Sequence, residues 1–242
     1  QPRSTLFPYT TLFRSIYKMK NFKFFPFILL LVFFTTKVHS QGIMSVHFGP
    51  SFPVSDFGSD NIFDEDAGGA AVGFNIGLKY TYPLNDKGLG LFGGVDFNYN
   101  GLKKDFKDDV EDLVNSVYSN VDIKFSKYIN IPVTAGLHYA YQADDKIGVF
   151  ANAGLAINFL KMTNMELKAD GQKSTQKMDL AYGIGFKIGG GILINKKTSI
   201  SLDYFGLGKH DMDGEVESGG SSQDIDGELK IDLLTLTLGF RF

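Results

Sequence analysis

The chain has 242 residues with no cysteine and no tryptophan, but it contains 28 glycines, 23 phenylalanines and 11 tyrosines. The absence of cysteine excludes disulfide bonds, cysteine-ligated metals and a lipid-anchored N-terminal cysteine. Residues 1–40 hold six of the 24 Lys and Arg and none of the 27 Asp and Glu, so the chain without them has 18 basic against 27 acidic residues, a net charge of −9. Nucleic-acid binding depends on phosphate neutralisation, so we expect no nucleic-acid partner.

Two N-terminal segments are not expected to belong to the fold. Residues 1–18 are interpreted as non-native, adapter-derived or upstream translation, because Met19 is a better start. From Met19, two lysines precede an apolar run over residues 24–34, which is shorter than the roughly 20 residues of a membrane-spanning helix. With Val38 and Ser40 at positions −3 and −1, we predict a signal peptide over 19–40, cleaved before Gln41. A short buried helix is the alternative.

Eight strand-like runs follow in the remaining chain, and most are long enough to cross a bilayer as tilted strands, which needs about 9–11 residues. They lie near residues 43–50, 70–82, 89–100, 125–141, 146–160, 178–194, 198–208 and 229–242. Their connections alternate between short (83–88, 142–145, 195–197) and long (51–69, 101–124, 161–177, 209–228). This alternation is typical of outer-membrane barrels, with short periplasmic turns and long outer loops. We therefore predict an all-β fold, an eight-stranded antiparallel up-and-down transmembrane β-barrel over residues 41–242, with both ends in the periplasm.

The two faces of the predicted strands differ in a way that favours lipid on one side. At the C-terminus, large apolar residues from Leu234 to Phe242 alternate with Thr, Gly and Arg. The second face of most strands carries Gly, Asn, Thr and Ser with isolated charges, which suits the crowded interior of a narrow barrel. Aromatic residues at strand ends are expected to form interfacial girdles: Tyr80, Tyr82, Tyr99, Tyr139, Tyr141, Phe159, Phe240 and Phe242. A soluble secreted barrel or sandwich is the alternative fold, and a hairpin within 101–124 would give ten strands.

Four segments carry a family resemblance: YINIPV (128–133), AYGIGFKIGGG (181–191), SLDYFGLG (201–208) and the terminal LTLGFRF. The chain over 41–242 resembles the PorT-like, porin-family small outer-membrane β-barrel proteins of Gram-negative bacteria. The resemblance implies a bacterial outer-membrane location, with outer-membrane lipid and lipopolysaccharide as partners. It also implies that the barrel-assembly machinery recognises a C-terminal signal formed by Leu236, Leu238, Phe240 and Phe242. It does not imply one activity, although some members serve protein secretion.

Charged residues on the small-residue face are the first candidate functional group. They are Lys79, Asp96, Lys187, Asp203 and Arg241, with His47 and His138 as candidates to join them. One interpretation is a selectivity or gating cluster in a channel. The preferred interpretation is a plug of paired charges, because buried charges persist when they are paired and small barrels are filled by side chains.

Two of the long loops carry further patterns. Residues 209–228 contain Asp-x-Asp-Gly at Asp211 and at Asp224, but the full EF-hand spacing is absent, so a solvated acidic loop is preferred over a Ca²⁺ site. Residues 103–118 are expected to form a short amphipathic helix, with Phe106, Val110 and Leu113 on its apolar side. Packing of this helix against its own barrel is the preferred interpretation, and capping of the barrel mouth or docking of a protein partner is the alternative.

A search for catalytic residues gives only a weak candidate. His210, Asp211 and the serines of 218–222 share a loop, but no spacing fixes them as a triad, and no phosphate loop or zinc motif occurs. We therefore expect no enzyme activity, no cofactor and no metal. The leading functional hypothesis is a closed barrel with a structural, adhesive or secretion-associated role through its extracellular loops. A narrow channel for small solutes is the alternative, and a lipid-modifying enzyme comes third.

Overall fold

A computed structural model describes residues 42–64, 66–144 and 146–242. Residues 41–242 form one compact unit. The predicted upstream segment and signal peptide lie outside the described residues.

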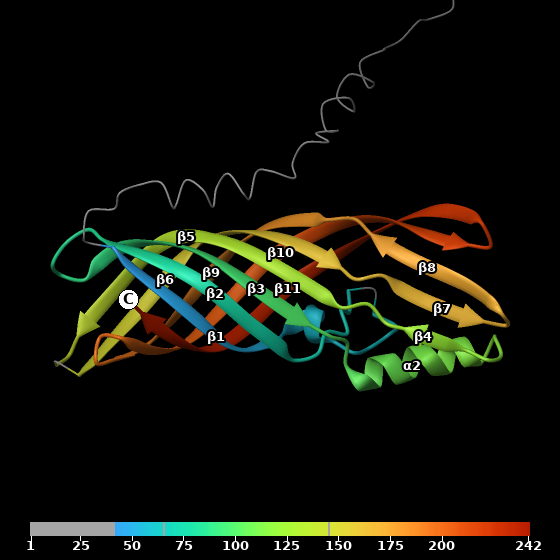
Figure 1. Cartoon of the computed structure of the whole chain (residues 1–242), viewed down its shortest axis with the longest axis horizontal. Helices are drawn as coiled ribbons and strands as arrows, with labels where there is room; N and C mark the ends of the chain where they lie inside the picture. Colours follow the sequence, from blue (N-terminus) through green and yellow to red (C-terminus); the bar gives the residue numbers. More distant parts are fainter. Residues whose placement is uncertain (1–41, 65, 145) are drawn as a thin grey trace, which may run out of the picture. The chain divides into compact units, whose positions relative to one another are not determined.

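Eight long strands form a closed antiparallel ring. Figure 1 views this barrel from the side. They are β1 (Ile43–Pro53), β2 (Gly73–Pro83), β3 (Leu89–Asn100), β5 (Tyr128–Gln142), β6 (Ile147–Met162), β9 (Ala181–Ile194), β10 (Thr198–Ser218) and β11 (Ser221–Arg241). Each strand pairs with the next, and β11 closes the ring against β1 with a register from Ser45↔Arg241 to Pro53↔Leu233. The predicted eight-stranded up-and-down barrel is confirmed. The short turns and the C-terminus lie at one end, on the left of Figure 1.

The prediction of long loops at 209–228 and 161–177 is wrong, because both segments continue as strands. β10 and β11 are 21 residues long each and remain paired up to Ser218↔Ser221, with one register shift between Gly206 and Gly208. Residues 161–177 form the end of β6, β7 (Met165–Ala169) and most of β8 (Gln172–Met178). The two hairpins turn at Asp170-Gly171 and Gly219-Gly220, all four with positive φ, which matches two-residue turns of the I′ type.

The long connection between β3 and β5 is helical, as its periodicity predicts. It contains α2 (Lys104–Asn115) and the three-residue strand β4 (Asp122–Lys124), which pairs with β7. It holds no hairpin, so the ring keeps eight strands. A short 3₁₀ helix, η2 (Ser55–Gly58), follows β1. Among the described residues, no helix is long and apolar enough to span a membrane.

The outward face of the ring is apolar over most of its height. Exposed outward residues include Ile76, Leu78, Leu91, Val95, Leu155, Ile157, Ile184, Ile188, Leu236 and Leu238. Aromatic side chains flank this band at both ends. We call Phe74, Tyr99, Phe159 and Tyr182 the outer girdle, and Tyr80, Tyr82, Tyr139, Tyr141, Phe240 and Phe242 lie at the opposite end. Soluble proteins rarely expose a continuous apolar surface of this extent to water, so the band faces lipid.

Candidate functional site

The middle of the barrel holds a buried polar cluster centred on Asp96. Asp96 Oδ1 lies 2.6 Å from His47 Nε2 and accepts a hydrogen bond from Asn75 Nδ2 at 3.2 Å. The Lys187 ammonium lies 3.6 Å from Asp96 Oδ2 and 3.8 Å from Asp203 Oδ2. Lys187 is 3% exposed and Asp203 is 4% exposed. The structure thus brings together three of the five interior charges singled out from the sequence, and His47 joins them.

The other two interior charges lie in a different group, built around Phe150. Lys79 Nζ is 4.8 Å from the centroid of the Phe150 ring, and Arg241 Cζ is 5.7 Å from it. His138 Nδ1 lies 2.7 Å from Asn152 Oδ1, and its ring is 5.8 Å from Phe150. Cations over an aromatic face are stabilised by the ring quadrupole. In the sequence, the signal for this group was Phe150, a large aromatic residue on the small-residue face of β6.

Buried asparagines extend the polar network above Asp96, and sequence reasoning missed their role. Asn75 Nδ2 donates to Asn98 Oδ1 at 3.0 Å, and Asn158 Nδ2 donates to Asn130 Oδ1 at 2.8 Å. The same Asn158 amide lies 2.9 Å from Nε2 of the buried His210. Each of these amides has one of its two polar atoms hydrogen-bonded, whereas Asn75 Oδ1, Asn98 Nδ2, Asn130 Nδ2 and Asn158 Oδ1 have no partner among the described residues. The signal was present in the sequence as asparagines on the small-residue face, Asn98 and Asn100 of β3 and Asn152 and Asn158 of β6.

An apolar plug closes the barrel above the asparagines. Phe57 of η2 is fully buried and meets Tyr128 edge to face, with ring centroids 5.0 Å apart. The Tyr128 hydroxyl donates to the backbone carbonyl of Gly68 at 2.6 Å, so both ends of the connection between β1 and β2 are fixed inside. The plug is completed by inward residues of the other strands: Ala156, Leu160, Phe205, Leu207, Leu229, Ile231 and Leu233. Residues 51–69 were expected to form an outer loop, whereas Phe57 within them lies in the core.

Within residues 42–64, 66–144 and 146–242, these layers fill the middle of the barrel with buried side chains. Residues around an open pore would expose surface to water. Asp96 is 1% exposed, and Asn98, Asn130 and Asn158 are not exposed at all. The barrel is therefore closed by its own side chains.

Beyond the outer girdle, five strand segments form a sheet that we call the extracellular sheet. It consists of β4, β7, β8 and the outer halves of β10 and β11, residues 209–218 and 221–230. Its outward face carries exposed ion pairs, including Lys168–Asp122 at 3.0 Å and Lys177–Glu217 at 2.5 Å. The hydrogen bond from Lys177 lowers the pKa of the Glu217 carboxyl below its ordinary value. Solvent screening makes such exposed pairs weak.

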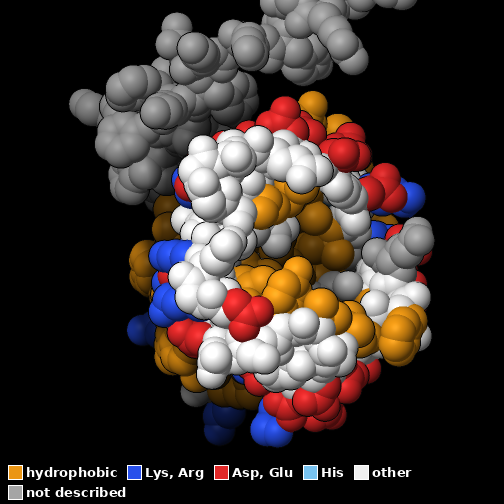
Figure 2. Space-filling model, turned by 90° about the vertical axis from the view of Figure 1, so that its right-hand side faces the viewer, with side chains coloured by type: hydrophobic (Ala, Val, Ile, Leu, Met, Phe, Trp, Pro, Cys, Tyr) orange, Lys and Arg blue, Asp and Glu red, His pale blue; other side chains and the backbone are white. Residues whose placement is uncertain are grey.

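The inward face of the extracellular sheet carries the apolar side chains of the sheet, together with Ser174, Gln176 and Ser218. Met165, Leu167, Met212, Val216 and Ile225 are half-buried on this face, and Met212 packs against the plug. Figure 2 looks at this end of the molecule and shows a hollow lined with hydrophobic side chains, with acidic side chains gathered on its rim. The two faces of the sheet thus carry different chemistry.

The acidic residues of 209–228 lie opposite one another on the outward face of the β10–β11 hairpin. The register pairs Asp211 with Glu228, Asp213 with Asp226 and Glu215 with Asp224. Like charges directly opposite destabilise a pair of strands. Among the described residues, no group of three or more His, Asp or Glu side chains is arranged to hold a metal ion.

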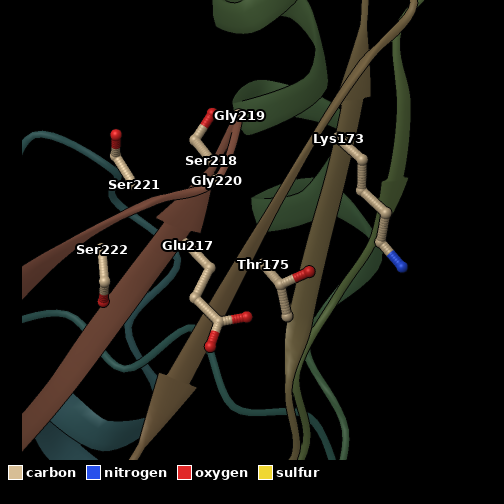
Figure 3. A pocket seen from close by; sticks show the side chains of 8 residues that line it. All are labelled: Lys173, Thr175, Glu217, Ser218, Gly219, Gly220, Ser221 and Ser222. Carbon is tan, nitrogen blue, oxygen red and sulfur yellow. The ribbon is translucent and has the colours of Figure 1, made fainter.

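The candidate catalytic residues are not brought together. The serines lie at the hairpin tip, beside a hollow of about 440 Å³ that Lys173, Thr175, Glu217 and residues 218–222 line (Figure 3). There, Ser222 Oγ donates to Glu215 Oε2 at 3.1 Å. His210 is instead buried in the barrel against Asn158, and Asp211 points outward. No nucleophile–base pair forms from these residues.

Helix α2 uses only part of its apolar side within the molecule. The Phe106 ring packs against Gly69, where an added β-carbon would lie 2.6 Å from the ring. Val110 and Val114 are half-buried, whereas Leu113 is 56% exposed and Val117 is 71% exposed. The helix therefore packs on its own barrel through Phe106 and leaves an apolar end free.

Comparisons with known proteins agree with this architecture. Residues 27–242 match the family model described as outer membrane protein beta-barrel domain. Similar solved structures include Ail, the attachment invasion locus protein of Yersinia pestis, at 16% identity with a TM-score of 0.39, covering 84% of this chain and 100% of that chain. Neisserial surface protein A is 16% identical with a TM-score of 0.40, covering 84% and 98%. OprG of Pseudomonas aeruginosa is 15% identical with a TM-score of 0.47, covering 84% and 97%. No curated protein matches the chain.

Proposed function

Because the chain belongs to the outer membrane protein beta-barrel domain family, we propose that it is a closed outer-membrane barrel that acts through its extracellular sheet and helix α2. The observation that carries the proposal is the filled lumen, with the Asp96 cluster and the Phe57 plug stacked above one another. A barrel filled in this way serves as a rigid support. What it offers to the outside is a two-faced sheet and the exposed apolar end of α2.

The narrow channel remains the second candidate, because lysine, arginine and aspartate side chains do line the interior. An open channel would require both the Asp96 cluster and the Phe57 plug to move out of the lumen, because either of them alone closes the barrel. The motion would break the ion pairs of Lys187 and expose charges that are now paired. The closed barrel needs no such step.

Recording current across a planar lipid bilayer tests the two candidates. We expect the inserted protein to give no discrete current steps under voltage, with protease protection of the barrel as the control for insertion. Discrete steps whose size changes in a Lys187→Gln variant would overturn the closed-barrel proposal. A matched Lys168→Gln variant, altered on the exposed sheet, is expected to behave as the unmodified protein.

The finer assignments belong to the same proposal. The likeness to PorT-like barrels supports a secretion-associated role, alongside structural and adhesive roles, and crosslinking from Leu113 on α2 would identify a protein partner.

The outward-facing Leu236, Leu238, Phe240 and Phe242 support recognition by the barrel-assembly machinery. Replacing Phe242 with Asp should then reduce the amount of assembled barrel in cells. N-terminal sequencing of the exported protein tests cleavage before Gln41. We propose no catalytic activity.

A further inference from the structure

The outer half of β11, residues 221–230, is paired along one side only. β1 leaves β11 after Pro53↔Leu233, where the Val54 N–H donates to the Asp232 carbonyl at 3.0 Å. Beyond this point β11 pairs with β10 alone, and among the described residues no third strand pairs with it. One edge of β11 is therefore open along the line that β1 would follow if it continued.

Alternate residues of β11 direct their backbone groups at this edge. The two-residue turn makes Ser218 and Ser221 a hydrogen-bonded pair, so odd-numbered residues of β11 bond to β10 and even-numbered residues point away from it. The bond to the Asp232 carbonyl follows the same rule. Among the described residues, the even-numbered N–H and C=O groups beyond it have no backbone partner. We call this the open edge, and its residues are Ser222, Asp224, Asp226 and Glu228.

The side chains of the open edge form an acidic row on the outward face of the sheet. Asp224 and Asp226 are exposed, and both lie opposite further carboxylates of β10. Within the described part of the chain neither forms an ion pair, whereas Glu228 is paired with Lys209. Residues 209–230 contain seven Asp and Glu against two Lys. The outward side of the open edge therefore carries negative charge that the molecule does not neutralise.

The inward side of the open edge carries apolar residues and has room for more. Ile225 is half-buried there, and Leu229 is buried in the plug. Between them, a β-carbon added to Gly227 would meet no atom within 4 Å. Figure 2 shows the hydrophobic hollow that this face borders, with acidic side chains on its rim. A strand added at the open edge would place every second side chain over this hollow.

The opposite edge of the same hairpin already holds a strand that suits the acidic row. β8 pairs there with residues 214–218 of β10. On the outward face, Lys177 Nζ lies 3.6 Å from Glu215 Oε1 and 2.5 Å from Glu217 Oε1. On the inward face, Met178 is buried. β8 therefore combines an outward cation with an inward apolar residue, and the open edge lacks such a neighbour.

A second copy of this chain does not suit the open edge. Two open edges side by side would bring Asp224 and Asp226 against the same carboxylates of the other copy, and like charges opposite one another destabilise strand pairing. Charged side chains on edge strands protect proteins against such self-association. The same charges attract a strand that carries cations, so a partner of opposite charge fits this edge.

We propose that the open edge binds an extended segment of another protein by strand addition, with lysine or arginine at alternate positions and apolar residues between them. This inference rests on the proposed function, in which the barrel acts through its extracellular sheet, and it names the chemistry of the partner. Backbone hydrogen bonds to the open edge supply affinity in this mode, and alternate side chains supply specificity. The cations lie beside Asp224 and Asp226, and the apolar residues lie beside Ile225 and over Gly227.

A short synthetic peptide in which lysine and valine alternate tests the open edge. It is titrated onto the full chain in nanodiscs of zwitterionic phospholipid, with empty nanodiscs as the blank. We expect saturable binding, and much weaker binding of a peptide of the same composition whose lysines are grouped at one end. Bound peptide should slow amide exchange of Asp224, Asp226 and Glu228 by about tenfold, because their N–H groups gain partners. The N–H groups of Ile225 and Gly227 already bond to β10 and should change little.

Substitutions separate the open edge from the general charge of the hairpin. We expect Asp224→Asn with Asp226→Asn to raise the dissociation constant about ninefold, since each opposite-charge cross-strand pair contributes a factor of about three. The matched control, Asp211→Asn with Asp213→Asn, removes two carboxylates from the outward face of β10 and should change it by less than about twofold. Asp226→Pro, which also removes an N–H directed at the open edge, should weaken binding more than Asp226→Asn.

Each competing explanation gives a distinct result. Equal binding of the grouped-lysine peptide, or an equal loss in the control double variant, would overturn strand addition in favour of general electrostatic attraction. A dimer of the chain that protects the same amides without peptide would assign the open edge to a second copy. No binding of the alternating peptide would overturn this inference but not the closed barrel, which the bilayer recordings test separately. The retention of heat-modifiable gel mobility confirms that each variant is folded.

Discussion

The two halves of the β10–β11 hairpin carry opposite chemistry on the same continuous strands. In the barrel half, outward positions are apolar, such as Leu202 and Leu236, and the inward Asp203 is buried beside Lys187. In the extracellular half, outward positions are acidic, such as Asp213 and Asp226, and the inward Met212 and Ile225 are half-buried. The backbone register is unbroken apart from one bulge. The surroundings, lipid below and water above, therefore decide which side chains each half presents outward.

The same division separates two kinds of ion pair. The pairs of Lys187 inside the barrel are almost completely buried, whereas those of Lys168 and Lys177 on the extracellular sheet are open to solvent. Removing one partner of a buried pair leaves an uncompensated charge in a medium that solvates it poorly. Removing one partner of an exposed pair leaves a charge that water solvates. The two regions should therefore respond very differently to equivalent substitutions.

Replacing Lys187 with Met should give the largest effect. The carboxylates of Asp96 and Asp203 would lose their shared cation, and Asp203 Oδ1 has no hydrogen-bond partner even now. We expect the free energy of unfolding to fall by about 3–5 kcal/mol, as for other broken buried pairs. Urea unfolding in lipid vesicles, followed by tyrosine fluorescence, measures this change.

A second substitution and a matched control sharpen this prediction. Adding Asp203→Asn to Lys187→Met removes one unpaired charge and should recover part of the loss. Lys168→Met, which breaks only an exposed pair, should leave the unfolding midpoint nearly unchanged. A Lys187→Met variant as stable as the unmodified protein would mean that water reaches the Asp96 cluster.

Arginine placed on the outward face should distinguish lipid from water. Leu202 is exposed near the middle of the barrel half of β10. We expect Leu202→Arg to lower the free energy of unfolding by about 2–4 kcal/mol, the cost of a cation near the bilayer midplane. Asp213→Arg, on the same face of the same strand but in the extracellular half, should not destabilise the barrel. If both variants lowered the free energy of unfolding in vesicles by a similar amount, both positions would face the same medium.

Relief of the cross-strand acid pairs should give a smaller, opposite effect. Asp226 lies directly opposite Asp213, so Asp226→Lys replaces a like-charge pair with an opposite-charge pair. We expect backbone amide exchange in the outer half of the hairpin to slow by roughly two- to fivefold. Ser222→Lys near the tip adds the same charge and a cross-strand pair with Glu217 but relieves no acid pair, so it should slow exchange less than Asp226→Lys. Unchanged exchange in Asp226→Lys would mean that solvent already screens the repulsion.

The sequence was sufficient to predict the barrel because lipid imposes a strict alternation on every spanning strand. The structure contains the predicted outward apolar residues, the short turns at one end and the aromatic residues at strand ends. The extracellular strands were missed because they alternate polar with weakly apolar residues, which resembles a loop. Asp170-Gly171 and Gly219-Gly220 are hairpin signals that would have revealed them.

The interior was predictable in composition but not in arrangement. Alternation places Lys79, Asp96 and Lys187 on the inward face, but packing across the lumen decides which of them meet. Lys187 of β9 reaches Asp96 of β3, although these strands are not neighbours in the ring, whereas Lys79 lies over Phe150. Phe57 lies in a long connection with no alternation, so its burial depends on a fit between η2 and the barrel mouth that only the folded structure provides.

The smallest expected effect concerns a single exposed carboxyl. The Lys177 hydrogen bond lowers the pKa of Glu217, so the pair stabilises the extracellular sheet above the ordinary pKa of glutamate, and this contribution is lost as the pH falls through the lowered value. In Lys177→Met, the pKa of Glu217 should rise toward its ordinary value, as followed by the carboxyl ¹³C shift during an NMR titration. Lys168→Met should leave the titration of Glu217 unchanged, because Lys168 pairs with Asp122. A Glu217 titration that is insensitive to Lys177→Met would mean that this exposed pair does not persist in solution, unlike the buried pairs of Lys187.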